Sequence, residues 1–222
     1  MQNIHADKNA ENDPKVSRKN HILEAAAKLF SQQGYEGTSI NAVAKASNTQ
    51  KTLIQYHFSN KLRLWEATIA WVWQERDAVL PQYLNDSMLQ TLSEIDQRLL
   101  VKRLCESLLN FTFDHPHWVR LMFQEAATEG PRLDWMIEHF FKSDFENGLA
   151  MVNLAQEKEL LPQVNHLDLL HILSGAIIYL VNVAPITAKV TGENPYSAEY
   201  KTRHIETLMT IFNSQLNGQP TN

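Results

Sequence analysis

The sequence predicts an all-α protein of about nine helices, and three observations favour this class. Glycine and proline are scarce, at 7 and 8 of 222 residues, which argues against a turn-rich β-sandwich. Apolar residues recur at spacings of three and four along most of the chain, the period of amphipathic helices. No segment shows the alternating pattern of a convincing strand. We therefore expect helices joined by short polar or proline-containing loops.

The composition indicates a globular protein with a sizeable core, since 44% of the residues are hydrophobic. The single Cys105 excludes an internal disulfide and a metal site built on paired cysteines. Residues 1–20 lack the apolar stretch of a signal peptide, and the longest apolar run, 176–181, is short for a bilayer. These features predict a soluble cytoplasmic protein that does not bind a membrane.

The charge is distributed unevenly along the chain. Residues 1–65 carry nine Lys or Arg against five Asp or Glu, a net charge of +4. The other 157 residues carry eleven basic and twenty acidic side chains, a net charge of −9. A basic N-terminal part on an acidic body is expected where only the N-terminal part meets nucleic-acid phosphates. A chance excess within a window of this length is the alternative.

The first helix is predicted from an apolar stripe, with Ser17 as its N-cap and Gly34 at its end. The stripe consists of Ile22, Leu23, Ala26, Leu29 and Phe30. Thr38 or Ser39 is the expected N-cap of a second, short helix over 40–46.

Ser47-Asn48-Thr49 interrupts this helix, and Asn tolerates a left-handed turn conformation well. A third helix is expected over 50–58. Ser59-Asn60 then caps a fourth helix that ends near residue 80.

Prolines and glycines separate the remaining predicted helices. These are expected over about 91–113, 117–129, 133–160, 166–188 and 198–216. We divide the chain into a disordered polar tail (1–16), an N-terminal helical domain (17–64) and a larger helical domain (65–222).

Two short helices joined by a tight turn, within the basic part of the chain, indicate a helix-turn-helix over about 38–58. In its second helix, Ile54 and Phe58 lie four residues apart and are expected to be buried. Lys51, Thr52 and Gln55 then share another face, where Gln suits adenine edges and Lys suits guanine.

Residues 18–64 also resemble the DNA-binding domain of TetR/AcrR-type transcriptional regulators. They read R-x-x-x-I-L-x-A-A-x-x-L-F-x-x-x-G-Y-x-x-T-S-I-x-x-V-A, followed by Tyr56-His57-Phe58-x-Asn60-Lys61-x-x-Leu64. The resemblance implies base contacts by four residues: Asn41, Lys51, Thr52 and Gln55. It implies phosphate contacts by four more: Ser39, Tyr56, His57 and Lys61.

The sequence departs from the family pattern in the motif itself. Asn48-Thr49-Gln50 stands where Gly-Val-Ser is common, and Gln55 replaces a common Tyr. These departures put the operator sequence in doubt. Simpler readings stand beside the family roles: Tyr56 as a core aromatic, His57 as a surface or capping residue, and Lys61 as a solvated lysine.

For residues 65–222 the resemblance implies ligand binding and homodimerisation. The helix over 166–188 is apolar nearly all round, so it must be covered on every side. A two-fold interface with the last helix would cover it. The interface residues expected from this reading are Gly175, Ala176, Ile177, Leu208, Ile211 and Phe212.

Aromatic and sulfur-containing side chains in the middle helices are the expected lining of a ligand pocket. The candidates are Phe111, Met122, Phe123, Trp135, Phe141, Phe145 and Tyr179. The same pattern fits an ordinary hydrophobic core, so both readings remain open.

Taken together, the sequence predicts a repressor that binds double-stranded DNA at a palindromic operator and is released by a small apolar or aromatic effector. An activator of the same fold and a helical protein-binding adaptor are the alternatives. The chain contains no G-x-S-x-G or H-E-x-x-H motif and no phosphate-binding glycine loop, so we expect no enzyme and no cofactor. The turn Asp114-His115-Pro116-His117 lacks a third ligand, so we expect no metal.

Overall fold

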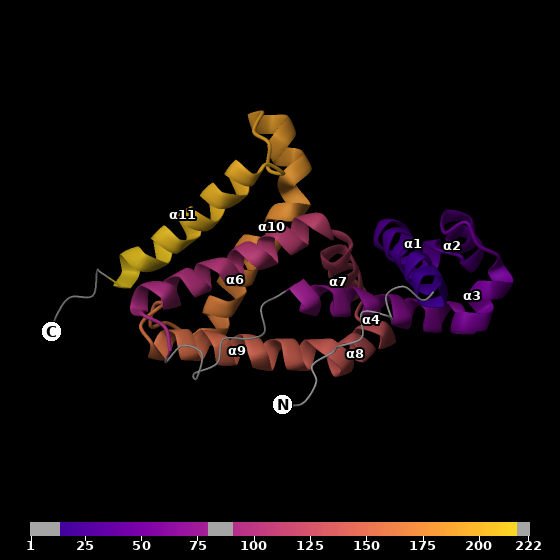
Figure 1. Cartoon of the computed structure of the whole chain (residues 1–222), viewed down its shortest axis with the longest axis horizontal. Coiled ribbons are helices and arrows are strands. Elements are labelled where there is room, and N and C mark those ends of the chain that lie inside the picture. Colours follow the sequence, from indigo (N-terminus) through magenta and orange to yellow (C-terminus); the bar gives the residue numbers. More distant parts are fainter. Residues whose placement is uncertain (1–13, 80–90, 217–222) are drawn as a thin grey trace, which may run out of the picture. The chain divides into compact units, whose positions relative to one another are not determined.

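A computed structural model describes residues 14–79 and 91–216, and all regular structure within them is helical (Figure 1). This confirms the all-α prediction. The helices are α1 (Pro14–Gly37), α2 (Ile40–Ala46), α3 (Lys51–Phe58), α4 (Lys61–Val79), α6 (Glu94–Asp114), α7 (His117–Thr128), α8 (Pro131–Met136), the π-helix η1 (Ile137–Phe141), α9 (Lys142–Glu157), α10 (His166–Thr191) and α11 (Ala198–Leu216). Because α8, η1 and α9 follow one another without a break, the described residues form the nine helical rods that the sequence predicts.

The N-terminal helices end where local chemistry requires it. Gly34 interrupts α1 with a φ of 71°, a left-handed conformation that glycine adopts without steric cost. Ser39, rather than Thr38, is the N-cap of α2, and Asn48 takes a φ of 48° in the turn before α3. The predicted Ser17 cap is wrong, because α1 already begins at Pro14. Most of the predicted polar tail, residues 1–13, lies outside the described residues.

Side-chain caps also fix the later helices. The backbone N–H of Arg63 donates to Asn60 Oδ1 at 2.9 Å, which caps α4 as predicted. Ser93 accepts from the backbone of Asp96 at the start of α6, and Asn165 caps α10. Residue 80, the expected end of α4, lies outside the described part of the chain.

The chain forms two compact units. In the first, described over 14–75 and 117–128, α7 packs against α1 although about 80 residues separate them along the chain. Gln124 of α7 donates to the Ser31 carbonyl at 2.9 Å. Trp118 contacts the edge of Trp73, with ring centroids 6.0 Å apart. The unit thus extends beyond the predicted domain of residues 17–64, and α7 completes its core.

The second unit, described over 76–116 and 129–216, buries one hydrophobic cluster formed by α6, α9, α10 and α11. Cys105 lies in this cluster, where burial raises the pKa of its thiol to about 11. Arg76, in the last turns of α4, forms two hydrogen bonds of 2.6 Å to the Asp144 carboxylate of α9. Burial lowers the pKa of Arg76, but its bonds to Asp144 and Asp77 outweigh this and leave the pKa raised.

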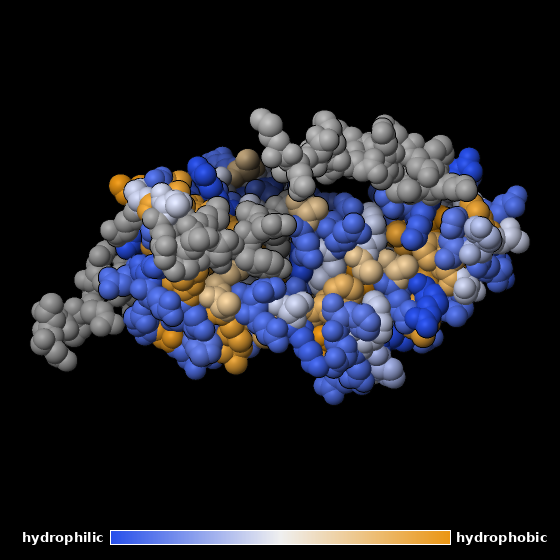
Figure 2. All heavy atoms as spheres, turned by 60° about the horizontal axis from the view of Figure 1, so that its bottom comes forward, coloured by the Kyte–Doolittle hydropathy of each residue, from blue (hydrophilic) through white to orange (hydrophobic). Residues whose placement is uncertain are grey.

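Helix α10 is not covered on every side within the described residues of a single chain, so the predicted cover by a second copy stays a prediction. Ile172, Tyr179 and Ile186 are each more than half exposed. By length and composition this helix alone, among the described residues, is apolar enough to span a membrane, which the short run at 176–181 did not suggest. Figure 2 shows that hydrophobic side chains also reach the surface in separate patches between hydrophilic ones.

We expect Trp118→Ala to lower the free energy of unfolding by about 3–5 kcal/mol, because Trp118 is almost fully buried in the core of the first unit. Urea denaturation followed by circular dichroism measures the change. Phe123→Ala on the same helix is the control, since Phe123 is 50% exposed and should cost much less. Equal losses for the two variants would contradict this role of α7.

Candidate nucleic-acid interface

The orientation of α3 is set by its two buried residues. Ile54 is fully buried and Phe58 is 5% exposed. Residues four apart share one face of a helix, so both side chains point into the first unit. Lys51, Thr52 and Gln55 are exposed on the remaining surface of α3, as predicted from their spacing. The helix therefore presents an amide, a hydroxyl and an ammonium group to solvent.

The start of α2 presents two further polar groups. Ser39 Oγ accepts the backbone N–H of Ala42 at 3.1 Å, which leaves the hydroxyl proton free to donate elsewhere. Asn41 is exposed in the first turn of the same helix. Both residues belong to the helix-turn-helix, so α2 supplies donors on either side of its N-terminus.

The end of α3 carries Tyr56 and His57. Tyr56 is 82% exposed, which contradicts a core role for this aromatic ring. His57 is half-buried, and its ring meets the Tyr56 ring edge-on with centroids 5.3 Å apart. The tyrosine hydroxyl is thus held outward at the end of the helix, where it can act as a hydrogen-bond donor.

Lys61, at the start of α4, is not simply a solvated lysine. Its Nζ lies 4.3 Å from the centre of the Tyr35 ring and donates to the Glu36 carbonyl at 3.4 Å. The Glu36 carboxylate lies 4.0 Å from the same ammonium group. These contacts hold the positive charge in place, and they also compete with any phosphate for it.

The electrostatic balance of the first unit favours an anionic partner. Over residues 14–75 and 117–128 it carries nine Lys or Arg and five Asp or Glu. The described residues contain no group of three or more side chains suited to hold a metal ion. The exposed hydrogen-bond donors of α2, α3 and α4 therefore belong to a unit whose net charge is positive.

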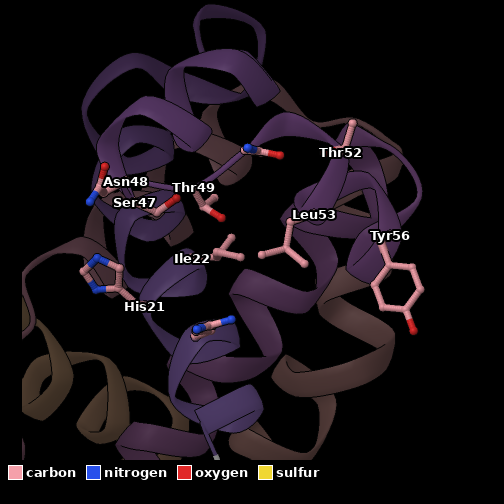
Figure 3. A pocket seen from close by; sticks show the side chains of 10 residues that line it. His21, Ile22, Ser47, Asn48, Thr49, Thr52, Leu53 and Tyr56 are labelled. Carbon is pink, nitrogen blue, oxygen red and sulfur yellow. The ribbon is translucent and has the colours of Figure 1, made fainter.

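A hollow of about 820 Å³ lies beside the helix-turn-helix. Its walls come from the first turns of α1, the turn at 47–50 and the face of α3 that bears Thr52 and Tyr56. Figure 3 shows Ile22 and Leu53 near its middle, with His21 on one side and Thr52 and Tyr56 on the other.

A helix-turn-helix with an outward polar face on its second helix, carried by a positively charged unit, is the arrangement of a DNA-binding protein. The comparisons with known proteins agree. Residues 22–68 match the sequence profile of the family described as bacterial regulatory proteins, tetR family.

Two curated bacterial regulators are similar to about half of the chain. The chain is 28% identical over 115 residues to the probable HTH-type transcriptional regulator YttP of Bacillus subtilis, covering 52% of this chain and 53% of YttP. It is 27% identical over 111 residues to IcaR of Staphylococcus aureus, a negative transcriptional regulator of the biofilm operon, covering 50% and 54%. The matched segment thus spans about half the length of these relatives.

The fold as a whole is similar to that of a putative fatty acid metabolism regulator from Clostridium perfringens. The TM-score is 0.67 at 16% sequence identity, over 91% of this chain and all of that one. At this identity the likeness concerns the fold alone. The family profile thus assigns residues 22–68 to the tetR family, and the curated relatives that share about half of the chain are transcriptional regulators.

The residues expected to line a ligand pocket are scattered in the structure. Phe111 is buried, whereas Phe123, Phe145 and Tyr179 are 45–65% exposed, and Met122 and Phe123 belong to the first unit. A hollow in the second unit, between α6 and α11, has a volume of about 220 Å³ and is lined by none of the seven candidates. Ligand pockets usually measure about 300–1,000 Å³, so the predicted pocket stays a prediction.

The expected interface residues are divided between core and surface. Ile177, Leu208 and Phe212 are buried in the core of the second unit, and Ala176 is half-buried. Gly175 and Ile211 are exposed. Of the three predicted positions on α10, Gly175 therefore lies on the exposed face, whereas Ile177 points into the core.

Sequence reasoning missed three participants in this region. Arg18 and His21 line the hollow beside α3, and Glu36 faces Lys61. Arg18 begins the stretch that resembles the family but was assigned no role, and His21 belongs to no motif. Glu36, directly after Tyr35 at the end of α1, is recognisable only once α4 is placed next to it.

Glu36→Gln should raise the affinity for DNA of any sequence by about two- to five-fold, because it removes a carboxylate that competes for Lys61. This range corresponds to an exposed ion pair of ~0.5–1 kcal/mol. Fluorescence anisotropy with labelled duplex DNA measures it. Glu24→Gln, on an exposed part of α1, is the charge-matched control. If both variants gain equally, only net charge matters and the specific competition is refuted.

Proposed function

We propose that the protein is a cytoplasmic repressor that binds a palindromic DNA operator as a homodimer and leaves it when a small effector binds. The observation that carries the proposal is the outward face of α3, on which Lys51, Thr52 and Gln55 are exposed while Ile54 and Phe58 are buried. Side chains of these types read base edges in the major groove.

Repression is favoured over activation by one relative, since IcaR is named as a negative regulator. Activation by the same fold would differ only in where the operator lies relative to a promoter. A protein-binding adaptor would need no polar recognition face beside exposed Tyr56 and Ser39. Regulation by DNA binding, without enzymatic activity, accounts for the polar face of α3 and for the exposed Tyr56 and Ser39.

The proposed contacts make two distinguishable predictions. Gln55→Ala should relax discrimination at one or two base pairs, by about 1–3 kcal/mol per pair, because it removes a base contact. Lys61→Ala should weaken binding to all sequences, because it removes a phosphate contact. It should also reduce the salt slope, the slope of the logarithm of the binding constant against the logarithm of the salt concentration, by about one. Anisotropy titrations at several salt concentrations, on cognate and substituted duplexes, separate the two effects. Operator affinity unchanged in both variants would refute the contact assignment.

For the homodimer, support comes from the outer face of α10. Six exposed residues on this helix are spaced by three or four positions: Ile172, Gly175, Tyr179, Asn182, Ile186 and Val190. This is the repeat by which helices pair along an apolar seam. Apart from its chain neighbours and the adjoining backbone of α10, a Cβ added at Gly175 would meet no atom within 4 Å, so the glycine leaves room for a second helix. A second copy of the chain presents the same seam and fits it by two-fold symmetry.

Ile186→Asp should therefore produce monomers in analytical sedimentation and abolish tight operator binding, because a charge would be buried at the seam. Ile95→Asp, at an exposed isoleucine on α6, is the matched control and should leave the dimer intact. A wild-type protein that sediments as a monomer at micromolar concentration would refute the dimer. Binding of that monomer to lipid vesicles would assign the apolar face of α10 to a membrane instead.

The effector part of the proposal rests on α4, whose residues belong to both compact units. In the first unit its start is held by the contacts of Lys61, and in the second its end is held by the Arg76–Asp144 pair. A ligand releases DNA only if it binds more tightly to a conformation of the dimer in which the spacing of the two helix-turn-helix motifs does not fit the operator. A coupling of ~1–3 kcal/mol would lower operator affinity by ~5–150-fold.

Apolar and aromatic compounds that raise the melting temperature should also weaken the DNA complex. Arg76→Met should reduce this coupling, because α4 would no longer be tied to α9. The measurement is a thermal-shift screen followed by a DNA-binding assay for each hit, in wild type and variant. Hits that stabilise the protein but leave DNA binding unchanged would refute the coupling.

A further inference from the structure

The hollow beside the helix-turn-helix is built differently from a pocket for an apolar effector. Its floor contains two apolar side chains, Ile22 and Leu53, and polar groups surround them. The surrounding residues are Arg18, His21, Ser47, Asn48, Thr49, Gln50, Thr52 and Tyr56. No carboxylate lines the hollow. The apolar side chains can pack against a deoxyribose, and the polar and basic side chains around them can bind its phosphate.

The hollow opens on the surface proposed to meet DNA. Thr52 and Tyr56 line it and also belong to the predicted DNA contacts of α3. Figure 3 shows these two side chains across the hollow from His21 of α1. A DNA strand that touches Thr52 and Tyr56 therefore passes within reach of the opposite wall.

The two basic side chains on that wall, Arg18 and His21, are available for a ligand. Arg18 and His21 are exposed, and no ion pair or side-chain hydrogen bond of either is found among residues 14–79 and 91–216. This contrasts with Lys61, whose charge is held by Tyr35 and Glu36. Arg18 and His21 lie three residues apart, so they share one side of α1.

We propose that Arg18 and His21 bind a backbone phosphate of the operator in this hollow and so extend the DNA contact from the helix-turn-helix to α1. The inference rests on the proposed DNA-binding function and adds two residues to it. Arg18 supplies a permanent positive charge with a planar set of donors suited to phosphate. His21 supplies a ring N–H donor on the same wall of the hollow.

The test compares wild type, Arg18→Gln and His21→Gln on a duplex that the wild-type protein has selected from a random pool. Each lost phosphate contact should lower the salt slope by about 0.9, which corresponds to ~8-fold in affinity at 0.1 M salt. His21→Gln should likewise weaken binding to DNA. Circular dichroism checks that the variants remain folded.

Lys28→Gln is the matched control, because Lys28 is exposed on α1 about two turns beyond His21 and does not line the hollow. Its DNA affinity should remain close to that of the wild type. If the wild type binds DNA but Arg18→Gln and His21→Gln behave like Lys28→Gln, the inference is wrong while the proposed function stands. If the wild type selects no DNA at all, both are wrong.

Discussion

The burial of Ile54 and Phe58 is the constraint on which the DNA-facing surface depends. Helix α3 has only eight residues, and its two buried side chains, four positions apart, fix its rotation about the helix axis. Lys51, Thr52 and Gln55 face outward as a consequence. The same unit includes α7, which packs on α1 and, through Trp118, on Trp73 of α4, so the unit depends on a helix far away in the sequence.

The basic side chains around α3 differ in how firmly other residues of the protein already hold them. Lys61 is already held by a ring and a carboxylate, which orients its charge but makes a phosphate compete for it. Arg18 and His21 have no such contacts among the described residues and meet solvent in the hollow. Binding DNA would therefore exchange one internal ion pair for new contacts at Lys61, whereas α1 would gain contacts without losing any.

Much of the fold could be predicted from sequence because its signals are local. Ser39, Asn48 and Asn60 each act within four residues of the backbone groups or turn they define, so the boundaries of α2, α3 and α4 are close to prediction. The packing of α7 on α1 leaves no local signal and was missed. For the same reason, apolar spacing on α10 indicated a buried helix but not which of its faces remains exposed.

The central claim is that two copies of the chain read a symmetric DNA site with their α3 helices. Selection of bound duplexes from a random pool tests it most directly. The account predicts an inverted repeat whose half-site centres lie one helical turn apart, about 34–36 Å, or a multiple of that distance. Enrichment of a single asymmetric site occupied by one protomer, or of no sequence at all, would contradict it.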